Sequence, residues 1–178
     1  MFTHELNSKN ASLNGEKAEL RFARIMKYYR YTVIKPTLRQ DKREHFDWKV
    51  ITRKGKEYRV DVKAIKRVDR SKPKQEAWYC MEMKNRLGYL GWLYGDAEYI
   101  AFEFSDGFYL VEREPLLKKS EALAGLKTSQ FTLSRAKKNK KPYQLYKPYT
   151  RPGNVDVIMY ITKKDLLSVN NIIIKDYK

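Results

Sequence analysis

The chain has 178 residues, and its 38 Lys or Arg against 21 Asp or Glu give a formal net charge of +17. Hydrophobic residues make up 42% of it, with 14 Tyr, so the composition excludes a disordered chain. A single Cys and two His exclude a disulfide scaffold and a zinc finger. The charge favours nucleic acid as the partner over an anionic membrane surface or an RNA-rich assembly.

The length predicts one domain over residues 1–178, with a basic, aromatic-rich loop or insertion at about 128–152. No run approaches the roughly 18 apolar residues of a membrane span, and residues 1–14 lack the apolar stretch of a secretory signal. We therefore expect no membrane partner and a cytoplasmic, reducing location.

Hydrophobic periodicity and turn residues predict alternating helices and strands, with residues 1–12 loosely ordered. Gly55 and Gly107 each follow short polar runs between apolar segments, which is typical of hairpins. The expected helices are 15–29, capped by Asn14 or Ser12, then 115–124, and 163–168, capped by Thr162, with a loop or short helix at 85–95. On the first helix the apolar residues up to Tyr29 gather on one face, and Lys17, Arg21 and Arg24 lie opposite. The expected strands are 31–34, 45–52, 56–65, 76–84, 98–104, 108–112 and 155–161.

The first hairpin predicts a pair of facing carboxylates. If its loop is Arg53-Lys54-Gly55, Thr52 pairs with Lys56, and counting back along the strands places Asp47 opposite Asp61. Opposed side chains have Cβ atoms about 5 Å apart, and Lys63 lies on the same face as Asp61. A two-residue loop would instead put Asp61 on the other face.

Two carboxylates this close repel each other unless a positive charge lies between them. Mg²⁺ is a natural occupant, because it prefers one or two carboxylates together with water and phosphate oxygens. Asp61 lies between two valines, where an unpaired carboxylate is costly to bury. A lysine at Lys63 can stabilise an attacking water or the charge that develops on a phosphate.

The first helix adds a further carboxylate. Glu19 lies about 60° from Phe22 around the helix, inside the apolar face, whereas Glu16 lies about 120° away at its edge. A carboxylate that faces the core needs a partner, so we prefer Glu19 over Glu16 as a group directed toward the Asp47–Asp61 pair.

This order of residues resembles the PD-(D/E)XK nuclease superfamily, which includes restriction endonucleases and Holliday junction resolvases. The matching segments are Gly15–Glu19, Phe46–Asp47 and Asp61–Lys63, and Phe46 stands where the name of the motif has Pro. The resemblance covers residues 15–64 and continues more weakly through 78–104. It implies an α/β fold with a mixed central β-sheet flanked by helices, in an αβββαβ core.

The resemblance also implies site roles. Asp47 and Asp61 would be metal ligands, Lys63 the catalytic lysine, and Glu19 a carboxylate that assists the metal or the water. The cofactor would be Mg²⁺, with Mn²⁺ able to substitute, and the reaction would be hydrolysis of a phosphodiester bond.

The segment 128–152 has seven Lys or Arg and no Asp or Glu, with spaced aromatic residues. This pattern favours contact with a nucleic-acid backbone plus base stacking over a merely solvated loop. The residues expected to make this contact are Arg135, Lys137, Lys138, Lys140, Lys141, Tyr143, Lys147 and Arg151.

The sequence thus predicts a metal-dependent DNA endonuclease, structure-specific or nicking, in DNA repair or recombination. A Holliday junction resolvase and a non-catalytic nucleic-acid-binding protein on the same fold are the alternatives, and a homodimer is plausible. The simpler interpretation of Asp47, Asp61 and Lys63 is a solvated strand face with an Asp–Lys ion pair. For Glu19 it is a carboxylate favoured by the helix dipole.

Overall fold

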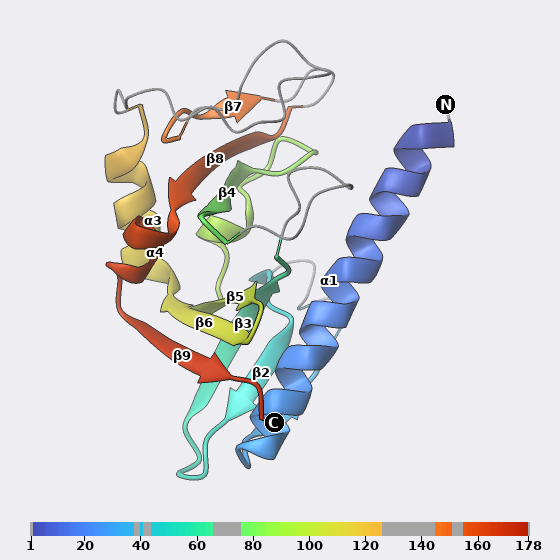
Figure 1. The fold of residues 1–178 in the computed structure, drawn as a ribbon, viewed down its shortest axis with the longest axis vertical. Helices are drawn as coiled ribbons and strands as arrows, with labels where there is room; N and C mark the ends of the chain where they lie inside the picture. The colour runs from blue at the N-terminus through green and yellow to red at the C-terminus, as the bar shows by residue number, and fades with distance from the viewer. Residues whose placement is uncertain are drawn as a thin grey trace. The chain divides into compact units, whose positions relative to one another are not determined.

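The computed structural model describes residues 2–37, 40, 44–65, 76–125, 145–150 and 155–177, with side chains from residue 12 onward (Figure 1). The chain divides into two compact units, which are described separately. Unit 1 comprises Met1–Ala64, Asp96–Leu110 and Asn171–Lys178, and unit 2 comprises Ile65–Gly95 and Val111–Asn170. The expectation of a single domain over the whole chain stays a prediction.

Unit 1 is a helix on a six-stranded sheet. The helix is α1 (Phe2–Tyr28), and the strands run in the order β1-β2-β3-β5-β6-β9. Neighbours β1–β2 and β2–β3 are antiparallel, whereas β3–β5 is parallel. The sheet is therefore mixed, and the predicted α/β class is confirmed. The strands are β1 (Thr32–Ile34), β2 (Trp48–Ile51), β3 (Glu57–Lys63), β5 (Tyr99–Phe104), β6 (Gly107–Glu112) and β9 (Asn171–Lys175).

The C-terminal half of α1 lies along this sheet (Figure 1). Its buried side chains recur at helical spacing and pack on the sheet, as the periodicity predicted. The ring of Phe22 meets Phe108 edge-on, with centroids 5.3 Å apart. Burying each such large apolar side chain contributes about 1.5–3 kcal/mol. The large buried side chains of this face are Phe22, Ile25 and Met26, and the alanines Ala18 and Ala23 are buried between them.

Three expectations for this helix were wrong. The helix starts at Phe2 rather than near Gly15, so Ser12 does not cap it; its hydroxyl instead donates to Glu16 one turn later. Tyr29, expected on the buried face, is exposed and lies beyond the end of α1. Arg21, expected on the solvent side, is half-buried because it pairs with Glu103.

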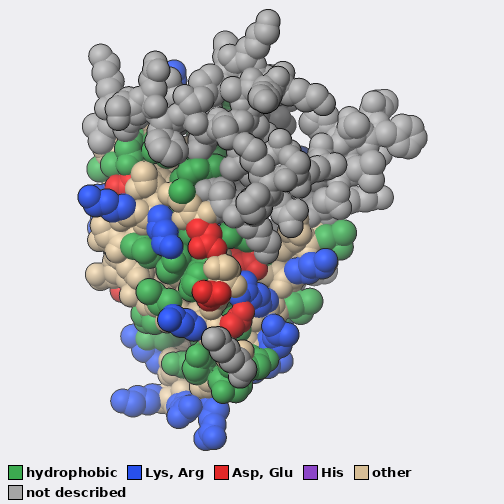
Figure 2. All heavy atoms as spheres, in the orientation of Figure 1, with side chains coloured by type: hydrophobic (Ala, Val, Ile, Leu, Met, Phe, Trp, Pro, Cys, Tyr) green, Lys and Arg blue, Asp and Glu red, His purple; other side chains and the backbone are tan. Residues whose placement is uncertain are grey.

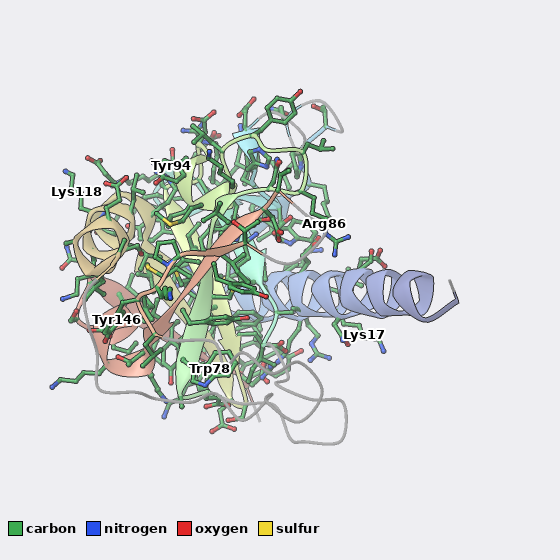
Figure 3. All side chains as sticks on the ribbon, turned by 90° about the horizontal axis from the view of Figure 1, so that it is seen from above. Lys17, Trp78, Arg86, Tyr94, Lys118 and Tyr146 are labelled. Carbon is green, nitrogen blue, oxygen red and sulfur yellow. The ribbon has the colours of Figure 1, made fainter. Side chains whose placement is uncertain are left out.

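Unit 2 contains a three-stranded antiparallel sheet in the order β4-β8-β7. Trp78 packs edge-on against Tyr160, with ring centroids 4.8 Å apart, and Tyr146 packs on the same cluster. Figure 3 labels Trp78 and Tyr146. The predicted cap at Thr162 is confirmed as a capping box with Asp165. The elements are β4 (Trp78–Lys84), η1 (Trp92–Tyr94), α3 (Arg113–Leu123), β7 (Tyr149–Thr150), β8 (Val157–Thr162) and α4 (Lys163–Leu167).

The predicted hairpins are confirmed within three residues at their ends, and the sequence analysis missed β7 and β9. No helix among the residues given above is both long and apolar enough to cross a membrane.

Candidate active site

The β2–β3 hairpin has the register predicted from its turn. Trp48 pairs with Val60 and Ile51 with Glu57, and the Thr52 amide donates to the Lys56 carbonyl at 2.8 Å. Gly55 has φ +79°, the left-handed conformation that glycine adopts without steric cost. The three-residue loop is therefore confirmed, and its register sets which side chains meet at the far end of the hairpin.

Asp47 lies just before β2 and is fixed to β3 through both its backbone and its side chain. Its amide donates to the Val60 carbonyl at 2.9 Å, and its Oδ2 accepts from the Val62 amide at 2.6 Å. The preceding His45 has φ +52°, a rare conformation for a residue with a side chain, and Phe46 is buried. The Asp47 carboxyl thus accepts a hydrogen bond from the β3 backbone just beyond the start of β2.

Asp61 is buried in the middle of β3, and its carboxyl meets two side chains. Its carboxyl interacts electrostatically with that of Asp47, and its Oδ2 lies 2.7 Å from the Nζ of Lys63. Lys63 is half-buried, two residues along the same strand. The structure therefore brings Asp47, Asp61 and Lys63 together, as the alternation along the strands predicted.

The electrostatics of this cluster favour one bound proton. Burial, and then the negative charge of Asp61, raise the pKa of Asp47 to about 7, against the opposing effects of Lys63 and the Val62 amide. Burial also raises the pKa of Asp61, while the charge of Lys63 lowers it. Two carboxyls in contact titrate as a pair, so near neutral pH the pair holds a proton for part of the time.

Glu19 lies within electrostatic range of this pair. It is half-buried on α1, and its charge contributes to raising the pKa of Asp61. Its carboxylate forms an ion pair with Lys35, whose Nζ also lies 4.7 Å from the centre of the Trp48 ring. Glu16, by contrast, is exposed, and the role of Glu19 at this site stays a prediction. Lys35 is a cation that the sequence analysis did not place at this site.

The carboxyl groups at this site could supply some, but not all, of the ligands of a divalent cation. The Asp47 and Asp61 carboxyls provide the one or two carboxylates that Mg²⁺ takes along with waters and phosphate oxygens. Within the described ranges, however, no three side chains of the His, Cys, Asp or Glu type come together as a ready-made metal cluster. The residues present therefore fit a cation held by two carboxyls, with Glu19 near it and the remaining ligands supplied by solvent or substrate.

The predicted nucleic-acid contact residues fall mostly outside the described ranges. Lys147 is described, and its side chain is exposed in unit 2. The structure describes nothing at the other seven positions, which are Arg135, Lys137, Lys138, Lys140, Lys141, Tyr143 and Arg151.

A second group of cations lies at the turn of the β2–β3 hairpin, at the opposite end of these strands from Asp47. Arg53 of the turn donates through its guanidinium to the Tyr29 carbonyl at 3.3 Å, which joins the turn to the end of α1. Figure 2 shows Lys and Arg side chains gathered at the lower end of the molecule, where Figure 1 draws this turn. We call this group the basic tip; its exposed members are Lys27, Arg30, Arg53, Lys54 and Lys56.

The sequence analysis did not find the basic tip, because its cations come from two segments that meet only in the fold.

Comparisons with models of protein families, with curated proteins and with solved structures found no match.

Proposed function

We propose that this chain is a metal-dependent DNA endonuclease whose active site is the Asp47–Asp61–Lys63 cluster. The observation that carries the proposal is the meeting of two acidic side chains and one lysine at the end of a hairpin whose register was predictable from its turn. Two carboxyls in contact in a buried setting are costly to maintain. A cation that binds them would offset that cost.

In this proposal, Asp47 and Asp61 hold a Mg²⁺ ion, or Mn²⁺ in its place. A metal ion held there would supply a water of lowered pKa and would neutralise charge on the scissile phosphate. Asp47 must release its proton before both carboxyls can bind a cation. Lys63, whose Nζ lies 2.7 Å from Asp61, then donates hydrogen bonds to the attacking water or to the phosphate oxygens. Glu19 orients a second water from α1.

The order of elements in unit 1 supports the proposed restriction-endonuclease-like core. A helix is followed by three antiparallel strands, and β5 then joins parallel to β3. The αβββαβ core requires a helix between these last two strands. The described part of that connection, residues 76–95, forms β4 and η1 instead. We therefore propose the core with this connection altered.

Charge supports a polyanionic substrate. The net charge is +17, and the basic tip places five exposed cations on unit 1, the unit that also contains Asp47 and Asp61. Contacts of this kind are made to phosphates and are independent of base sequence. They suit an enzyme that recognises DNA structure or nicks DNA, and a Holliday junction resolvase is one such enzyme.

The second candidate is a nucleic-acid-binding protein without catalysis. The observation in its favour is the internal ion pair of Asp61 with Lys63, together with the lack, among described side chains, of a third carboxylate in contact with the pair. In this candidate, the Asp47, Asp61 and Lys63 side chains only stabilise the end of the hairpin and take no part in a reaction.

One experiment separates the two candidates. The purified chain is incubated with supercoiled plasmid and with a four-way junction, in Mg²⁺, Mn²⁺ or EDTA. Lys63→Ala is compared with Lys49→Ala, which removes a half-buried lysine of the same hairpin that pairs with Glu57. Cutting that needs the metal, is lost in Lys63→Ala and persists in Lys49→Ala supports the nuclease. Binding without cutting, in all metals and equally in both variants, supports the second candidate.

A further inference from the structure

The turn after β4 has a tightly fixed backbone. The Asn85 amide donates to the Tyr89 carbonyl at 2.9 Å, and its side-chain Oδ1 accepts from the amides of Leu87 and Tyr89 at 2.9 and 3.1 Å. Gly88 has φ +84°, and Gly91 packs so closely that an added Cβ would lie 2.3 Å from the Glu82 carbonyl oxygen. A turn held in this way presents its side chains with little conformational freedom left to lose.

The side chains that this turn presents are large, apolar and exposed. Leu87 is 78% exposed, Tyr89 69% and Leu90 59%. Val155, 57% exposed, continues the surface, because its Cγ2 lies 3.6 Å from where a Cβ on Gly88 would be. Single exposed apolar residues are ordinary, but a rigid group of them marks an interaction site. We call these four residues the apolar turn.

Cations flank the apolar turn. Lys84 and Arg86 are both exposed, and Arg86 is labelled on this turn in Figure 3. Residues 83–95 contain these two cations and no acidic residue. The charge therefore favours a polyanion with an apolar part, which is the chemistry of a nucleotide: a phosphate beside a base.

We propose that the apolar turn binds DNA where its bases are unstacked, with Tyr89 stacked on a base, Leu87 inserted beside it, and Arg86 on the adjacent phosphate. Aromatic side chains stack on exposed bases, and leucine is among the side chains that wedge between base steps. Four side chains fall well short of the roughly 800 Å² per partner that a stable protein interface buries. The inference rests on the proposed function for its choice of DNA.

The test measures binding in EDTA, so that no cutting occurs. The probes are a fluorescein-labelled duplex with a central unpaired loop that contains 2-aminopurine, and the fully paired duplex of the same sequence. The variants are Tyr89→Ala, Tyr89→Phe, Arg86→Ala and Ile173→Ala, the last removing an exposed apolar side chain from unit 1. Because these side chains are exposed, loss of the fold is not expected, and circular dichroism checks it.

We expect Tyr89→Ala to weaken binding to the looped probe by about tenfold, the order typical of one base–aromatic stack, and to abolish quenching of 2-aminopurine. Tyr89→Phe and Ile173→Ala should bind as the wild type does, and the paired duplex should bind Tyr89→Ala nearly as well as the wild type. Arg86→Ala should weaken binding to both probes and reduce the salt dependence by about one phosphate contact.

Equal binding of the looped probe by the wild type and Tyr89→Ala would overturn the proposal. So would a sedimentation experiment in which Tyr89→Ala converts a dimer to a monomer, since the apolar turn would then be a contact between copies. This failure is distinct from that of the nuclease. Metal-dependent cutting lost in Lys63→Ala would stand if the apolar turn bound nothing, and Tyr89-dependent binding would stand if no metal supported cutting.

Discussion

Asp47 and Asp61 face each other at one end of the β2–β3 hairpin, where Trp48 pairs with Val60, and their carboxyl groups interact electrostatically. The negative charge of Asp61 raises the pKa of Asp47, whereas the charge of Lys63 lowers the pKa of both groups. Burial is the largest cause of the raised pKa of each group. A buried pair of acids with raised pKa values therefore occupies the place where the proposed mechanism needs a metal ion.

The first prediction concerns competition between that proton and the metal. Because the pKa of Asp47 is raised to about 7, the fraction of chains with both carboxyls ionised rises with pH through this value. We expect the Mg²⁺ concentration for half-maximal plasmid cutting to fall about tenfold between pH 6 and 8, with most of the fall below pH 7, and to level off above pH 8. Titrations of Mg²⁺ at fixed ionic strength measure this. An equal Mg²⁺ requirement at pH 6 and pH 8 would contradict it.

The second prediction concerns stability without metal. The pKa of Asp47 is about 7 when folded and 3.8 ordinarily, so the folded state binds the extra proton between these values. Stability from this group is therefore greatest below about pH 4 and is lost as pH rises toward 7. Asp47→Asn keeps an oxygen for the Val62 amide and carries no charge. We expect it to be more stable than the wild type at pH 8, on the order of 1–2 kcal/mol, and by much less at pH 5.

Urea unfolding in EDTA at pH 5, 6.5 and 8 measures this difference. Glu57→Gln removes an exposed carboxylate from the same hairpin and serves as the control, with no comparable gain at pH 8 expected. If Asp47→Asn were less stable than the wild type at every pH, the carboxyl pair would be a stabilising feature of the hairpin and the argument for a metal site would lose its basis.

The third prediction concerns Arg21, whose guanidinium joins α1 to two distant segments of unit 1. It donates to Glu103 at 2.9 Å and to the carbonyls of Phe104 and Ser105 at 3.0 and 2.8 Å, and it also pairs with Asp176 after β9. Removing one partner of a largely buried pair leaves the other charge uncompensated. We expect Arg21→Met to destabilise the chain by about 2–4 kcal/mol.

Hydrogen exchange locates the effect of this change. Faster exchange is expected in β9, since Asp176 directly follows this strand. Arg24→Met is the matched control, because Arg24 is exposed one turn away and lies over the ring of Tyr177. Similar losses in both variants would show that the contacts of Arg21 are not the cause.

The sequence predicted what local chemistry determines and missed what long-range contacts determine. Gly55 sets the hairpin loop, and the loop sets the meeting of Asp47 with Asp61, so this part of the site was predictable. Arg21 was assigned to solvent because its partners lie in segments far along the chain. β9 was missed because the three isoleucines of residues 172–174 follow no alternating pattern, and their pairing with β6 depends on the assembled sheet.

The last prediction compares two glycines of unit 1, of which one has no room for a Cβ atom and the other has. Gly107 opens β6 with φ +152°, and an added Cβ would lie 2.0 Å from the Ile174 carbonyl oxygen of β9. Gly15 lies within α1, and nothing lies within 4 Å of where its Cβ would be. We expect Gly107→Ala to destabilise by about 2–4 kcal/mol, because a backbone atom must move, and Gly15→Ala to stabilise by about 0.5–1 kcal/mol. Urea unfolding measures the change in stability of both variants. In Gly107→Ala, hydrogen exchange should be faster in β9. If Gly107→Ala had the same stability as the wild type, β9 would not pack closely against β6.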